Sequence, residues 1–257
     1  LLILLIPGII VTVNDASINA DIKKLLVFNL SGPFCLVISA MYMFNRRILF
    51  SDLQNVLIAM GLPIITTTIY LFLYNPSVKD VITGTQSNFE TSGGFGPNQV
   101  STILGLGVFV FFTQLILFSK SKKLIIINGA LVLFITYRGI VTFSRGGVIT
   151  AVAMIVFLLF FLYRNSNAKG KGGFLMVFAV TFLMGLGVWT YSSFQTYGMI
   201  EKRYANKDGL GRVKKDRLGG REEIMGEELK IFLDNPIMGI GAGMGKDVRK
   251  ETFGIEA

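Results

Sequence analysis

Arg145 is the residue whose type and setting most strongly indicate chemistry. It lies in the run Thr-Phe-Ser-Arg-Gly-Gly, residues 142–147, which separates two long apolar runs, 124–141 and 148–163. A guanidinium is always charged, and its planar fork of donors suits the oxygens of phosphate or carboxylate groups. We expect a tight Gly-Gly turn at a membrane surface here, where two glycines allow a bulky head group to approach the backbone. The alternative is a capped helix end with an interfacial arginine.

Arg138 is a second candidate for binding an anion. It precedes Arg145 by seven residues, or two helical turns, so the spacing predicts both side chains on nearly one face of the same span. An arginine within an apolar span costs roughly 2.5 to 3.5 kcal/mol on insertion scales. The expected spans contain no Asp or Glu, so we expect an anionic ligand as its partner unless a loop carboxylate pairs with it. An arginine-lined anion path in a transporter is the alternative.

The loop of residues 91–99, Thr-Ser-Gly-Gly-Phe-Gly-Pro-Asn-Gln, offers uncharged polar groups. Proline is common at the first position of a helix, so a helix is predicted to start at Pro97. Asn98 and Gln99 supply amide donors and acceptors that suit sugar hydroxyls. A helix-capping role for Asn98 is the alternative.

A polar segment after residue 191 contains one clear amphipathic helix, predicted over Arg221–Leu233. Its apolar stripe is expected to comprise Met225, Leu229, Phe232 and Leu233. The opposite, solvated face is expected to comprise Glu222, Glu223, Glu227 and Lys230. Four glycines then alternate between residues 239 and 245; because no strand precedes them, we interpret this run as a flexible turn and not as a nucleotide site.

Composition indicates the elements that must position these residues. Of 257 residues, 52% are hydrophobic and 16% charged, and the mean hydropathy is +0.60. These values predict a polytopic membrane protein. The net charge of +9 comes from short loops and one polar tail, so membrane topology explains it better than nucleic-acid binding. Cys35 stands alone and there is no histidine, so neither a disulfide within the chain nor an imidazole or thiolate metal site is expected.

About seven spans are predicted, because a bilayer core of ~30 Å requires roughly 20 apolar residues per helix. They are residues 1–13, 25–44, 53–74, 100–118, 124–141, 148–163 and 174–191. The fold class is therefore all-α, a transmembrane bundle over residues 1–191 with a large exoplasmic loop over residues 192–257. The first span starts within an apolar run and the last residues lie in a polar region, which we interpret as a fragment.

Alternate connections carry the positive charge, which sets the expected orientation. The basic residues are Arg46 and Arg47, then Lys120, Lys122 and Lys123, then Arg164, Lys169 and Lys171. The positive-inside bias places these three loops in the cytoplasm. The turn with Arg145 and the large loop are then expected on the exoplasmic face, which is the periplasm in a Gram-negative cell.

Three segments in this order resemble the O-antigen ligase and O-antigen polymerase superfamily. They are Gly-Phe-Gly-Pro-Asn-Gln, Phe-Ser-Arg-Gly-Gly, and a loop reading Gly-Gly-Arg-Glu-Glu-Ile followed by Asp-Asn-Pro-Ile-Met-Gly-Ile-Gly-Ala-Gly. The resemblance implies a bacterial inner-membrane enzyme that takes a glycan from an undecaprenyl pyrophosphate carrier on the periplasmic side. It matches Arg145 and Arg221 to the family's arginines. Family members commonly carry a histidine in the large loop a few residues beyond the glycine pattern, and this chain ends before that position.

The resemblance and the residue types together predict a metal-independent glycosyltransferase without a cofactor. Arg145 and Arg221 are expected to hold the pyrophosphate and Arg138 to assist them, while Asn98 and Gln99 contact sugar or carrier. Glu222 and Glu223 are candidates for the general base. A sugar on pyrophosphate already has a good leaving group, and the sequence has no Asp-x-Asp pair for a metal-dependent nucleotide-sugar transferase.

Two alternatives stay open at this stage. A polymerase extends a second carrier-linked glycan, whereas a ligase transfers to lipid A core or to a protein hydroxyl, and a polymerase is slightly favoured. A polytopic transporter of anions or of the lipid carrier is the rival from another class. Expected partners are the undecaprenyl-pyrophosphate-linked glycan, membrane lipid and the glycan-assembly proteins of surface polysaccharide synthesis, namely a flippase and a chain-length regulator.

Overall fold

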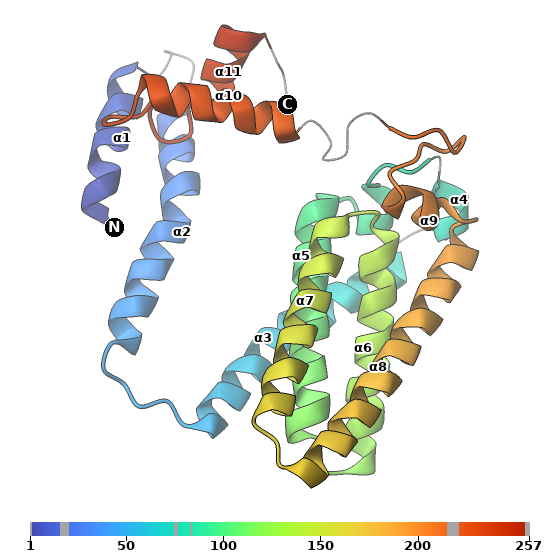
Figure 1. The fold of residues 1–257 in the computed structure, drawn as a ribbon. Helices are drawn as coiled ribbons and strands as arrows, with labels where there is room; N and C mark the ends of the chain where they lie inside the picture. The colour runs from blue at the N-terminus through green and yellow to red at the C-terminus, as the bar shows by residue number, and fades with distance from the viewer. Residues whose placement is uncertain (1, 16–20, 75–76, 83, 215–220, 255–257) are drawn as a thin grey trace. The chain divides into compact units, whose positions relative to one another are not determined.

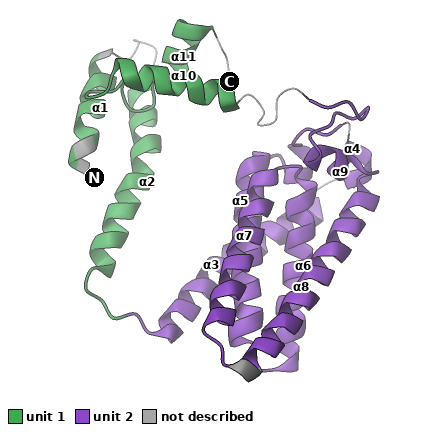
Figure 2. Ribbon diagram, viewed as in Figure 1, with its two compact units in different colours: residues 1–47, 216–257 green, residues 48–215 purple. Residues whose placement is uncertain are grey.

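The structure is a computed structural model that describes residues 2–15, 21–74, 77–82, 84–214 and 221–254. It divides into two compact units, which are described separately (Figure 2). Unit 1 comprises residues 1–47 and 216–257, and unit 2 comprises residues 48–215.

The regular elements of the described residues are all helices, and one isolated bridge joins Lys207 and Val213. Unit 1 contains α1 (Leu2–Asp15), α2 (Ile22–Met43), α10 (Arg221–Asp234) and α11 (Gly245–Phe253). Unit 2 contains α3 (Phe50–Tyr74), α4 (Val78–Val81), the 3₁₀ turn η1 (Glu90–Ser92), α5 (Pro97–Thr113), its π-helical continuation η2 (Gln114–Phe118), α6 (Lys122–Val141), α7 (Arg145–Arg164), α8 (Ala168–Gln195) and α9 (Met199–Tyr204) (Figure 1).

The prediction of an all-α polytopic bundle is confirmed. Among the described residues, six helices are long and apolar enough to cross a membrane, namely α2, α3, α5 with its flanking turns, α6, α7 and α8. The remaining expected span is the first in chain order, residues 1–13, and it corresponds to α1. That helix has 14 residues and a shorter apolar run, so at about 1.5 Å per residue it reaches only some 21 Å.

Helix α5 is the centre of unit 2. It contacts α3, α6 and α7. Of the most apolar stretch of α5 with its flanking turns, 61% is buried, against 17% for α7 and 6% for α8. Glycines permit this close packing: a Cβ on Gly107 would lie 2.5 Å from the Ile64 side chain of α3. In lipid, where apolar area alone drives little helix association, such small residues let backbones approach and gain dispersion contacts.

The crossing of α5 and α7 is the tightest of these contacts. A Cβ on Gly147 would overlap the carbonyl oxygen of Ser101, and one on Gly105 would overlap the carbonyl oxygen of Gly147. Ser101 and Gly105 are one helical turn apart, so α5 presents a small-xxx-small face to α7. Gly147 is therefore required by helix packing, and it is not available to a ligand.

Unit 1 corrects the interpretation of the alternating glycines as a flexible turn. The Ala242 N–H donates to the Gly8 carbonyl of α1 (3.0 Å), and the Thr12 hydroxyl donates to the Ala242 carbonyl (3.1 Å). Gly241 and Gly243 have positive φ angles of 101° and 86°, and a Cβ on either would lie within 3 Å of an α1 or α2 side-chain atom. The glycines thus allow this segment to dock closely on α1 and α2.

Helix α10 confirms the predicted element but not its predicted faces. The expected apolar stripe is exposed, since Met225, Leu229, Phe232 and Leu233 keep 57% to 68% of their accessible surface. The buried residues are Ile231 and Glu227, the latter predicted on the solvated face. The periodicity of the stripe correctly predicted a helix. The face of that helix that becomes buried depends on the neighbouring helices.

Candidate functional site

The turn before Arg145 has a different geometry from the expected Gly-Gly turn. Helix α6 ends at Val141, Phe143 adopts the left-handed conformation with φ of 59°, and Ser144 is the N-cap of α7. Arg145 is the first residue of α7, and Gly146 and Gly147 belong to its first turn. The chain reverses at a buried phenylalanine, 1% exposed, because packing of its ring offsets the strain of that φ angle.

This break also corrects the expectation that Arg138 and Arg145 share one face of one span. Arg138 lies in the last turn of α6, whereas Arg145 opens α7. The seven-residue spacing therefore crosses a helix reversal. Both arginines nevertheless lie at the same end of the bundle, because the turn of residues 142–144 connects them directly.

Arg138 is 6% exposed, and its guanidinium is held by the 91–99 loop. Its Nη2 donates to the Thr91 carbonyl at 3.2 Å. Its Nε lies buried without a hydrogen-bond partner among the described residues. A buried cation requires compensation, and here one bond to a backbone carbonyl gives part of it. Arg138 thus ties the loop before α5 to the end of α6; its role as a direct substrate ligand stays a prediction.

Asn98 reaches the same turn from α5. The Ser144 hydroxyl donates to Asn98 Oδ1 at 2.8 Å, and the Ser101 hydroxyl donates to the Ser144 carbonyl at 3.1 Å. Ser144 makes no side-chain capping bond to α7, because its hydroxyl donates to Asn98 instead. The amides of the first turn of α7 therefore lack their usual serine cap, next to a glycine, Gly146, with open space above its Cα. Helix N-termini of this kind attract anions.

Gln99 lies apart from this group. Its side-chain amide oxygen lies next to Gly96: a Cβ added to that glycine would be 3.2 Å from this oxygen. Asn98 and Gln99 are both exposed. Of these two predicted sugar-contacting residues, the structure brings Asn98 alone to the Arg145 turn.

Arg203 is a functional candidate that the sequence analysis missed. It lies in α9, and its Nε donates to the Phe143 carbonyl at 3.1 Å, across sixty residues of sequence. In sequence it stands within an unremarkable mixture of acids and bases, and no local pattern marks it. A charged donor on the carbonyl of the left-handed residue stabilises the conformation that positions Arg145.

Tyr204 completes the cationic turn, which we define as Arg138, Arg145, Arg203 and Tyr204 around residues 142–144. Burial raises the pKa of Tyr204 to about 12, although the positive charges of Arg145 and Arg203 act in the opposite direction. The phenol therefore keeps its proton at neutral pH. Its hydroxyl is buried without a hydrogen-bond partner among the described residues, and its ring packs edge-on against Trp189. A protonated phenol beside two guanidinium groups can donate to an anion.

An apolar cavity of about 650 Å³ lies between α5, α6, α7 and α8. Its lining includes Val188 and Trp189 near the end of α8, and Ile140 near the end of α6. These three residues also pack with Phe143 and Tyr204 in one hydrophobic cluster. The cavity therefore extends from the underside of the cationic turn into the span region of the bundle.

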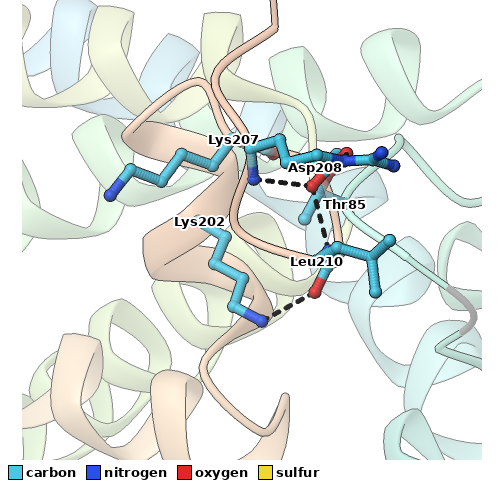
Figure 3. A network of polar contacts seen from close by, with 7 residues as sticks. Thr85, Lys202, Lys207, Asp208 and Leu210 are labelled. Atoms are coloured by element: carbon cyan, nitrogen blue, oxygen red, sulfur yellow. Dashed lines mark hydrogen bonds and ion pairs between the residues drawn. The ribbon is translucent and has the colours of Figure 1, made fainter.

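The segment after α9 folds back to hold it in place (Figure 3). Lys202 Nζ donates to the Gly209 carbonyl at 2.7 Å, and the buried Thr85 hydroxyl donates to the Lys207 carbonyl at 3.0 Å. Asp208 Oδ1 accepts the backbone N–H groups of Leu210 and Arg212, and the Arg212 N–H is the main cause of a lowered pKa at Asp208. These bonds fix the helix that carries Arg203.

Arg203→Met is expected to lower the free energy of unfolding by about 1.5 to 3 kcal/mol, because the Phe143 carbonyl loses a charged donor. Arg212→Met is the control. The Arg212 side chain is 74% exposed in an ion pair with Asp208, so its loss is expected to cost less than about 1 kcal/mol. Chemical denaturation in detergent measures both values, and equal effects of the two substitutions would contradict a specific role of Arg203 at the turn.

Three remaining predicted site residues open α10 in unit 1. Arg221, Glu222 and Glu223 form its first turn, and all three are exposed. Pairing of Arg221 with Arg145 on one pyrophosphate stays a prediction, as does a general-base role for either glutamate. Among the described residues, no group of three or more His, Cys, Asp or Glu side chains is placed to hold a metal ion.

A family model described as O-antigen ligase matches residues 129–255. The match includes both sides of the Arg145 turn, α9 with Arg203, and the glycine segment that docks on α1 and α2. No curated protein and no solved structure matches the chain. Members of this family act on lipid-linked glycans. The six helices of the described residues that are long and apolar enough to cross a membrane fit a multi-pass protein. Residues 129–255 of this chain are thus similar to the O-antigen ligase family.

Proposed function

We propose that this protein is a glycosyltransferase that takes a glycan from an undecaprenyl pyrophosphate carrier at the periplasmic face of the inner membrane and polymerises or ligates it. The match of residues 129–255 to the O-antigen ligase family supports glycosyl transfer. The observation that carries the proposal is the cationic turn. Arg145 opens α7 at a helix N-terminus without its serine cap, with Arg203 and Arg138 around the same reversal. Positive charge is thereby concentrated where apolar helices end.

The chemistry needs charge stabilisation on the phosphates and a base for the acceptor hydroxyl. The acceptor hydroxyl oxygen forms a bond to the anomeric carbon as the bond from that carbon to the pyrophosphate oxygen breaks. The leaving pyrophosphate keeps the electron pair, and the hydroxyl proton passes to a base. A guanidinium ~4 Å from a phosphate oxygen contributes about 4 kcal/mol at an effective dielectric near 20. Arg145, the α7 amides and the Tyr204 hydroxyl are the groups that would stabilise this developing charge.

The apolar cavity suits the hydrocarbon part of such a donor. Its lining contains Val188 and Trp189, which pack in one cluster with Tyr204. A polyprenyl chain in the cavity would therefore place its pyrophosphate at the cationic turn. Exclusion of water from this end of the bundle strengthens the interaction of the arginines with phosphate.

Glycan transfer by the purified protein in detergent tests the proposal. The reaction contains undecaprenyl-pyrophosphate-linked oligosaccharide and no nucleotide, metal or ATP, and products are resolved as a ladder on a gel. Chain growth on the carrier is the expected result for a polymerase, and transfer only after addition of a second acceptor is the result for a ligase. Absence of transfer, together with movement of carrier or solute across liposomes, would establish the transporter instead.

A further inference from the structure

A second pocket of unit 2 lies beside the cationic turn and is not used by the proposed chemistry. Its volume is about 430 Å³, within the usual range for small-molecule sites of roughly 300 to 1,000 Å³. It is formed where α8 ends and α9 begins, with one residue from α4. Its lining includes Lys79, Thr190, Ser193, Phe194, Tyr197 and Glu201.

Two aromatic rings are exposed at this pocket. Phe194 and Tyr197 keep 69% and 66% of their accessible surface. Tyr197 has a positive φ of 50°, a conformation that a bulky residue rarely adopts and that recurs at functional sites. The Lys79 ammonium lies 5.0 Å from the Phe194 ring centroid and 5.9 Å from that of Tyr197, which orders both rings around one cation.

The polar groups of the pocket are already oriented. The Ser193 hydroxyl donates to Glu201 Oε1 at 2.5 Å, and the serine is 9% exposed while the glutamate is exposed. One bond holds the carboxylate in place, and a carboxylate can accept several more. Lys79 adds ammonium donors beside the same two rings. The pocket therefore combines two aromatic rings with a carboxylate acceptor and an ammonium donor.

We propose that this pocket, the Phe194–Tyr197 pocket, binds a sugar ring of the acceptor glycan. A pyranose has apolar C–H faces that stack on aromatic rings and an equator of hydroxyl groups that donate to carboxylates and accept from ammonium groups. A phosphate would be repelled by Glu201, and an acyl chain would leave Glu201 and Lys79 without partners. The combination of both kinds of group in one pocket selects a carbohydrate.

The position of the pocket gives the bound sugar its role. Glu201 and Arg203 belong to the same short helix, α9, and lie two residues apart, roughly 3 Å along its axis. One end of this helix faces the pocket, and the other contacts the Phe143 carbonyl. A glycan held at Phe194 and Tyr197 would thus be separated from the cationic turn by this one short helix. The acceptor role rests on the proposed function; the binding of carbohydrate does not.

Direct binding is the first test. The probe is the oligosaccharide repeat released from the surface polysaccharide of the source bacterium, free of carrier, added to the protein in detergent and followed by saturation-transfer-difference NMR. We expect Phe194→Leu, Tyr197→Gly and Glu201→Gln each to weaken binding about tenfold. Glycine at position 197 accepts the positive φ, so that variant removes the ring and leaves the turn intact.

Tyr191→Leu is the matched control. Tyr191 is 52% exposed on the same helix, α8, and does not line the pocket. Aromatic side chains also collect at membrane interfaces as anchors. If the rings serve only as anchors, Tyr191→Leu and Phe194→Leu behave alike and neither Glu201→Gln nor Tyr197→Gly changes binding, a result that overturns the proposal. Absence of oligosaccharide binding by the unaltered protein overturns it as well.

Kinetics then separate this site from the cationic turn. In the transfer assay the pocket variants are expected to raise the KM for acceptor about tenfold, with the KM for donor and kcat at saturating acceptor within about twofold of the unaltered protein. A fall in kcat with unchanged acceptor KM would contradict an acceptor site. If the unaltered protein binds the oligosaccharide but transfers no glycan from the carrier, the proposed enzymatic function fails while the carbohydrate site stands.

Discussion

Arg145→Lys is expected to lower the rate of glycan transfer about 100-fold while leaving the folded protein intact. Lysine keeps the positive charge at the start of α7 but loses the planar fork that bonds two phosphate oxygens at once. A charged hydrogen bond contributes about 1.5 to 3 kcal/mol, and each 1.4 kcal/mol changes a rate tenfold. The measurement is the initial rate of transfer at saturating donor and acceptor.

Arg164→Lys is the control for that substitution. Arg164 is the last residue of the same helix and is exposed at its opposite end, so the exchange is expected to leave the rate unchanged. Unaltered activity of Arg145→Lys would exclude Arg145 as a pyrophosphate ligand. Equal losses in both variants would indicate a general effect of lysine in α7.

Gly147→Ala is expected to cause the largest loss of stability of any single methyl group added to this bundle. Its Cβ would overlap the backbone carbonyl of Ser101, so α5 and α7 must move apart along their crossing. Overpacking of this kind costs about 1 to 3 kcal/mol or more when backbone has to move. The yield of monodisperse protein and its unfolding temperature in detergent measure the effect.

Gly146→Ala provides an internal comparison one residue away. A Cβ at Gly146 meets no atom within 4 Å, and alanine favours a helix more than glycine does. We expect Gly146→Ala to be neutral or slightly stabilising. Similar unfolding temperatures for the two variants would contradict the close approach of α5 and α7. A drop in transfer by Gly146→Ala without loss of stability would instead indicate that the open side of α7 receives the head group.

Most of the fold could be predicted because membrane spans depend on length and apolarity alone. Six of the seven expected spans correspond to helices long and apolar enough to cross a membrane, and Pro97 starts α5 as predicted. The first expected span is a 14-residue helix. Helix α10 was also predicted close to its observed bounds, since its periodicity and breakers are local signals.

The site could be predicted only in part. Arg145 was proposed as a site residue because an arginine between two apolar runs is unusual in any arrangement of the helices. The backbone conformation around Arg145 was not predicted. The run of residues 142–147 suggests a glycine turn, whereas the chain reverses at Phe143. No local rule favours a left-handed phenylalanine; its buried ring stabilises it. Arg203 and Tyr204 were missed because they lie about sixty residues after the Arg145 turn in sequence, and only folding brings them next to it.

The sequence by itself determined the membrane class, the helices, the family resemblance and the candidate arginines, all of which follow from residue type and local spacing. The tertiary structure decided which glycines pack helices and which remain open, which face of α10 is covered, and which charges meet at the Arg145 turn. Those outcomes depend on contacts between residues distant in sequence. A periodic pattern specifies a face of a helix, but the neighbouring helices decide what that face contacts.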